Sequence, residues 1–212
     1  RPMDVANFEI NAETNDWTRG NRGIADCEPI PSPATWSFGN PGTALGRSSS
    51  AAAYILSAGG SHQLEAVNWK ATAATTDLVQ FTMALPWRMR RYSGRSKSGL
   101  LLAIRCRKHD TTGSATEDAD LGLSVTAIFQ SPTIGSDGTE ADGTGFVTST
   151  ADTQLLPAKS ADNAPGKARV YRFDLFKGLT DAQKAAIVPG STVTIRIAPS
   201  KTVGTALAAQ VF

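Results

Sequence analysis

The chain is poor in the residues that most catalytic and metal sites use. It holds two cysteines, Cys27 and Cys106, and two histidines in 212 residues. No spacing among them matches a zinc site, and two cysteines allow at most one disulfide, whose formation the sequence leaves open. No apolar run approaches the roughly 20 residues that a membrane span needs, so we expect no membrane partner.

Charge is also scarce. Charged residues make up 19% of the chain, and the formal net charge is +2. A balance so close to zero gives no general indication of a nucleic-acid partner. Alanine, serine, threonine and glycine are abundant instead, which is typical of a β protein with many turns. A chain of this length can form a single all-β domain with a sizeable core.

The clearest pattern lies in the C-terminal fifth of the chain. Apolar residues alternate with more polar ones over residues 169–175 and 191–198, which predicts two half-buried strands. Between them, residues 179–187 predict a short helix. Thr180 is its expected N-cap, and Gln183 stands three residues later, as a capping box requires.

Similar alternation predicts further strands across the rest of the chain. We expect residues 77–86 and 100–108 to pair with each other through a flexible hairpin connection at 91–99. The whole pattern predicts an all-β fold, an antiparallel jelly-roll β-sandwich with one short helix near residues 180–187. The remaining predicted strands are 5–10, 53–57, 63–70, 121–130 and 206–212, with a short segment at 145–148.

The first 50 residues differ from the rest. Residues 11–50 have little periodicity, and prolines throughout the stretch interrupt regular pairing. We therefore divide the chain into an N-terminal extended arm or covering loop, 1–50, and a jelly roll, 51–212. Trp17 and Trp36 favour an ordered segment over a disordered one, because large aromatics are rare in chains that stay unfolded.

Several segments carry a family resemblance. Asn7-Phe8-Glu9, Trp17 and a Gly-rich stretch ending in Ala53-Tyr54-Ile55-Leu56 resemble the opening of jelly-roll carbohydrate-binding modules of the galactose-binding-like kind. The later strands follow the same plan. Members of that family commonly carry a calcium-binding Asp near their last residues, but residues 205–212 here contain no carboxylate. The long N-terminal region also resembles cement or decoration proteins of tailed-phage heads.

The candidates for catalysis are few, and we predict no enzyme and no cofactor. A nucleophile needs a base within hydrogen-bond reach, but His62 and His109 stand where solvated loop histidines would. Cys106 alternates with buried positions, which favours an inert thiol. The two acidic loops, residues 117–120 and 137–143, do not follow the ligand order of an EF-hand, so solvated turns are favoured over calcium sites.

Four tryptophans offer a possible sugar-binding surface, because a flat indole stacks on a pyranose face. Core or anchor packing is the commoner role of tryptophan. Trp69 and Trp87 stand at predicted strand ends, whereas Trp17 and Trp36 stand in loops. The glycan-stacking candidates are therefore Trp17 and Trp36.

Charge is distributed unevenly along the chain. Basic residues gather in the predicted hairpin of residues 88–108, and no acid occurs between Leu78 and His109. This pattern fits a solvated surface, an interface with an acidic neighbour, or, less well, single-stranded nucleic acid beside Trp87 and Tyr92. The candidate interface residues are Arg88, Arg90, Arg91, Arg95, Lys97, Arg105 and Arg107.

These observations favour a non-enzymatic virion structural protein. The expected role is decoration or cementing of a phage capsid, with self-association, a trimer being the expected state, and with the major capsid protein as second partner. Its expected location is the capsid surface of the virion. The alternative is a carbohydrate-binding module or a glycan-binding tail component.

Overall fold

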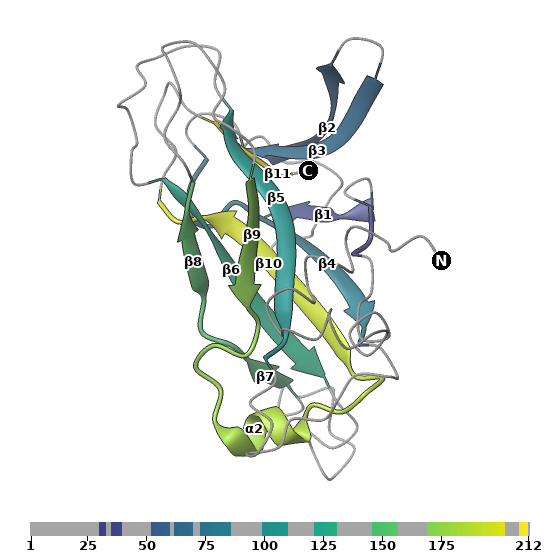
Figure 1. Ribbon diagram of the computed structural model, residues 1–212, viewed down its shortest axis with the longest axis vertical. Coiled ribbons are helices and arrows are strands. Elements are labelled where there is room, and N and C mark those ends of the chain that lie inside the picture. The colour runs from purple at the N-terminus through teal and green to yellow at the C-terminus, as the bar shows by residue number, and fades with distance from the viewer. Residues whose placement is uncertain are drawn as a thin grey trace, which may run out of the picture.

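The computed structural model describes two packed antiparallel sheets and one short helix in the segments that it covers (Figure 1). In the figure, β5 and β9 pass in front of β10 and β6, and α2 lies at the lower end. The described residues are 30–32, 35–39, 52–59, 62–69, 73–85, 99–109, 121–130, 146–156, 169–201 and 208–211.

Sheet A has six strands in the order β1-β4-β10-β6-β7, and β8 also pairs with β6. Because β7 and β8 pair with opposite ends of β6, they share one edge of the sheet. The strands are β1 (Ser37–Gly39), β4 (Leu78–Ala84), β6 (Gly122–Gln130), β7 (Phe146–Thr148), β8 (Asp152–Leu155) and β10 (Thr192–Pro199).

Sheet B has five strands in the order β2-β3-β11-β5-β9. All its pairings are antiparallel, as are those of sheet A. The strands are β2 (Ala52–Gly59), β3 (His62–Trp69), β5 (Leu101–His109), β9 (Arg169–Asp174) and β11 (Ala208–Val211). The predicted all-β sandwich is thus confirmed.

The core lies between the inward faces of the two sheets. Along β6 and the residue before it, the five residues expected to face inward are all buried, while the alternate residues from Ser124 to Gln130 are half-buried. The same alternation holds in β10. Each strand therefore contributes every second side chain to the core, as the pleat of a strand requires. The five buried residues are Leu121, Leu123, Val125, Ala127 and Phe129.

The predicted helix forms as α2 (Asp181–Ala186) between β9 and β10. Thr180 is its N-cap, and the reciprocal bonds of a capping box join Thr180 and Gln183. Leu179 and Ile187 flank the helix and are both buried. Because these two side chains reach the core, they attach this short helix to the end of the sandwich.

The predicted pairing of residues 77–86 with 100–108 is wrong. β4 lies in sheet A between β1 and β10, whereas β5 lies in sheet B between β11 and β9. The connection between them crosses from one sheet to the other. Both strands present apolar residues to the same core, but from opposite sheets. The alternation of apolar and polar residues is the same in two strands that pair and in two strands that face each other across a core, so it could not distinguish these arrangements.

Part of the predicted N-terminal arm belongs to the sandwich. β1 extends sheet A, and Trp36 and Phe38 are buried in the core. The boundary placed at residue 50 is therefore wrong for this segment. The predicted strand 5–10 lies outside the described residues.

The residues of β8 do not predict a strand. Its inward positions are Asp152 and Gln154, so the segment has no hydrophobic alternation. In the part of the chain that the structure covers, no helix has the length and apolarity to cross a membrane.

Candidate functional site

The predicted basic interface is described at only two of its positions. Arg105 is exposed on β5, opposite Val170 of β9. Arg107 is the register partner of Gln210 in β11. Because β4 and β5 do not form a hairpin, the seven basic candidates do not lie on one hairpin. Their role as an interface stays a prediction. Outside the described residues lie Arg88, Arg90, Arg91, Arg95 and Lys97.

Trp36 does not offer a stacking surface, and its assignment as an exposed glycan-stacking residue is wrong. The side chain is buried, its ring stacks on Phe81 with centroids 4.8 Å apart, and its Nε1 donates to the carbonyl of Pro31 at 3.0 Å. Trp69 is also buried, and its Nε1 donates to the Asp77 carbonyl at 2.7 Å. Trp17 lies outside the described residues.

The thiol of Cys106 is buried and free. Burial raises its pKa far above the ordinary value, so the thiol stays protonated and unreactive in the fold. His62 and His109 stand at the first position of β3 and the last position of β5. Within the described ranges no group of three or more potential ligands could hold a metal ion. Both acidic loops lie outside those ranges.

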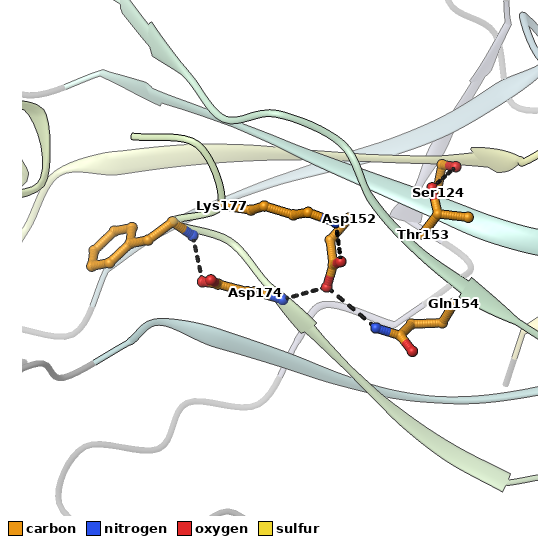
Figure 2. Close-up of polar contacts among 7 residues, drawn as sticks. Ser124, Asp152, Thr153, Gln154, Asp174 and Lys177 are labelled. Carbon is orange, nitrogen blue, oxygen red and sulfur yellow. Dashed lines mark hydrogen bonds and ion pairs between the residues drawn. The ribbon is translucent and has the colours of Figure 1, made fainter. Parts of the chain in front are cut away.

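Among the described residues, a polar cluster around Asp152 joins the two sheets. Asp152 of β8 accepts hydrogen bonds from the Lys177 ammonium at 2.7 Å, from the Asp174 backbone N–H at 2.9 Å and from the Gln154 amide at 3.5 Å. Figure 2 shows the Asp152 carboxylate between Lys177 and Asp174. Asp174 in turn accepts a bond from the N–H of Phe176 at 2.8 Å.

These contacts determine the charge state of Asp152. Burial acts to raise its pKa, but the hydrogen bonds from Lys177 and Asp174 and the positive charge of Lys177 together hold the pKa below its usual range. The carboxylate is therefore ionised at neutral pH, and its oxygens are occupied by donors. We interpret the cluster as a structural clamp between β8 and the end of β9.

The other candidate site is the solvent side of sheet A. On its strands, many of the residues that alternate with the core positions carry hydroxyl or amide groups, and among the described residues of this side Arg196 is the only charged one. We call this surface the sheet A outer face. Its polar and aromatic members are Gln80, Thr82, Ser124, Thr126, Gln130, Phe146, Thr148, Thr153, Thr192, Thr194 and Arg196, and its apolar members are Ala84, Ile128, Leu155 and Ala198.

Cross-strand hydrogen bonds orient several of these side chains. The hydroxyls of Thr82 and Thr194 lie 2.9 Å apart, and those of Ser124 and Thr153 lie 2.7 Å apart. The Nε of Arg196 donates to the Oε1 of Gln80 at 3.2 Å. A hydroxyl offers one donor and more than one acceptor position, so each pair keeps capacity for a ligand. The surface therefore presents fixed polar groups on a rigid sheet.

Phe146 adds an exposed aromatic ring at the edge of this face. It lies on β7 opposite Gln130, and its side chain is 41% exposed. The next residue, Val147, is buried in the core. Because successive side chains of a strand point to opposite faces, burying Val147 places Phe146 on the outer face.

Sequence reasoning did not select these residues. The alternation of residues 191–198 implies that Thr192, Thr194 and Arg196 share a face, and the Phe146-Val147 pair allows only one inward side chain. Those signals were present. Without the strand order, however, nothing brought residues from β4, β6, β7 and β10 together.

Comparison of this chain with known proteins shows similarity to solved structures in fold alone. No family model matches the chain, and no curated protein matches it. Among solved structures, TmCBM61 in complex with β-1,4-galactotriose has a TM-score of 0.35 and 7% identity, and the match covers 85% of this chain and 86% of that one.

Two further structures are similar to the same extent. A mutant of Xylanase10C from Cellvibrio japonicus in complex with xylopentaose has a TM-score of 0.38 and 13% identity, with 87% of this chain and 26% of that chain covered. A structure described as CBM4 has a TM-score of 0.31 and 13% identity, with 84% and 90% covered. These neighbours include carbohydrate-binding modules with β-sandwich folds, but scores this low assign no family.

Proposed function

We propose that the chain is a non-catalytic carbohydrate-binding module that binds an oligosaccharide across the sheet A outer face. The observation that carries the proposal is the exposed ring of Phe146 at the edge of a face that holds oriented hydroxyl and amide groups. A sugar offers both an apolar ring face and hydroxyls that donate and accept hydrogen bonds. Phe146 supplies the stacking surface, and Thr82, Thr194 and Gln130 supply polar partners.

A binding screen tests this proposal. Titration calorimetry against a broad panel of neutral and acidic oligosaccharides should find saturable binding. Phe146→Ala should weaken it at least about tenfold, because the ring loses contact area that binding buries. The matched control is Val170→Ala, which shortens a side chain of similar exposure, 43%, on sheet B.

Three results would count against the proposal. Absence of binding across the panel would reject it, and equal loss in both variants would reject the assigned surface. Cleavage of any bound oligosaccharide, detected by mass spectrometry, would reject the non-catalytic role.

A second candidate is decoration of a phage capsid by a homo-oligomer, with the major capsid protein as partner and the virion surface as location. It is favoured by exposed apolar residues on the outer face of β5 and β9. Leu101 and Val170 are both exposed there, and Arg105 of the predicted basic set lies opposite Val170. Apolar residues beside a charge are common in contacts between subunits.

Light scattering distinguishes the second candidate. A trimer that dissociates on Val170→Glu and persists in Leu155→Glu, an exposed position of sheet A, would support contacts through β5 and β9. A monomer at every concentration and salt level would contradict it.

A further inference from the structure

Arg196 is placed at the centre of the sheet A outer face. β10 is flanked by β4 and β6, and Arg196 has Gln80 and Thr126 as its register partners. It is half-buried among hydroxyl and amide side chains. A strand of the same sheet therefore lies on each side of Arg196.

The positive charge of Arg196 has no carboxylate partner among the described residues. Its one polar contact there is the bond from Nε to Gln80 at 3.2 Å. A guanidinium has further N–H donors in a planar fork, and that fork matches the two oxygens of a carboxylate. Among the described residues, the face thus combines one cation with no anion, and its charge is complementary to an anionic ligand.

We propose that the ligand of the sheet A outer face is an acidic oligosaccharide and that Arg196 binds a uronic-acid carboxylate. This inference rests on the proposed function and names the chemical class of the ligand. Arg196 and Phe146 lie four residues apart along the strands and two strands apart across the sheet. These offsets correspond to about 13 Å and about 10 Å, so a ligand that contacts both residues spans more than one sugar ring.

The test compares uronates with methyl esters, in which a methyl group replaces the negative charge of each carboxylate. Trimers of galacturonic, glucuronic and mannuronic acid are titrated beside their methyl esters, which keep the sugar rings and remove the carboxylate charge. We expect at least one uronate trimer to bind more tightly than its ester. Arg196→Gln should lower that affinity roughly ten- to hundredfold and lower affinity for the ester by a smaller factor.

Two further variants separate charge from geometry. Arg196→Lys keeps the charge but loses the planar fork, so we expect an intermediate loss of affinity. Arg105→Gln removes an exposed arginine of sheet B and should leave uronate affinity unchanged. Circular dichroism of each variant shows whether the sandwich is retained.

The outcomes separate this inference from the proposed function. If the esters or neutral glycans bind as tightly as the uronates and Arg196→Gln has no effect, the acidic ligand is rejected and glycan binding stands. If no glycan binds, both proposals fail. Equal binding of an oligoglutamate peptide would reject a sugar as the specific occupant.

Discussion

At the scale of single residues, the polar clamp around Asp152 connects the two sheets on one side of the sandwich. Thr150, two residues before Asp152, also donates its backbone N–H to the Lys177 carbonyl at 2.8 Å. Side-chain and backbone bonds thus join the edge of sheet A to the turn that follows β9. Removing one side chain from the clamp should therefore affect the stability of the whole domain.

Asp152→Asn should lower the free energy of unfolding by about 1–2 kcal/mol at about pH 7. This loss lies at or below the low end of the range for a charged hydrogen bond, because the Lys177 side chain is 44% exposed and solvent screens its charge. Since folding lowers the pKa of Asp152, the stabilisation is present above the unfolded pKa of about 4. It is lost as pH falls through the folded pKa.

Urea unfolding at about pH 7 and about pH 3 measures this difference between wild type and variant. Asp181→Asn is the matched control, because it also removes a carboxylate paired with a lysine. The Oδ1 of Asp181 lies 3.8 Å from the Nζ of Lys184, but the Asp181 side chain is 76% exposed. We expect that change to cost less than about 0.5 kcal/mol. A difference for Asp152→Asn that stays constant with pH would contradict an ionised clamp.

Gly178 lies in the turn that the clamp holds. Its φ is +76°, and a Cβ there would collide with the Oγ1 of Thr150. Gly178→Ala should therefore destabilise the domain by about 1–3 kcal/mol. Gly99→Ala, where no heavy atom lies within 4 Å of the added Cβ, should change stability by less than about 0.5 kcal/mol. Equal effects in urea unfolding would contradict this account of the turn.

The residue scale also shows the limit of prediction from sequence for the site. The surroundings of Trp36 suggested a loop, yet its alternation with Phe38 is the pattern of a buried strand. Arg196 stood in a strand that was predicted correctly, on the side opposite its apolar residues. The sequence could place Arg196 on a surface, but the composition of that surface depends on which strands neighbour β10.

At the scale of elements, the best-predicted feature is the strand-helix-strand unit of β9, α2 and β10. Its signals are local: alternation within each strand and a capping box at the helix start. Pairing of β4 with β5 was predicted wrongly, because pairing depends on contacts between distant segments. β10 pairs with β4 although more than a hundred residues separate Thr194 from its partner Thr82.

The capping box gives a prediction at this scale. Thr180→Ala removes the hydroxyl that accepts the Gln183 N–H at 3.3 Å, and we expect a loss of about 1 kcal/mol in stability. Thr180→Ser keeps the hydroxyl, and because serine is at least as good an N-cap as threonine, stability should stay within about 0.5 kcal/mol of wild type. Thermal and urea unfolding of both variants measure the difference. Equal losses would mean that the cap does not hold α2.

At the scale of the whole molecule, the sandwich provides a rigid platform with two chemically different outer faces. Sheet A presents hydroxyl and amide groups around Arg196, with Phe146 at the edge. The outer face of β5 and β9 in sheet B presents Leu101, Val170 and Arg105. The fold class followed from the sequence because alternation is repeated in most strands. The composition of each outer face followed only from the strand order.

The most direct test of the central claim is the mapping of backbone amide shifts by nuclear magnetic resonance during titration with a uronate trimer. The account predicts that perturbed residues cluster on β4, β10, β6 and β7, around Arg196 and Phe146. Perturbations confined to sheet B, or no perturbation by any uronate or neutral oligosaccharide, would contradict it.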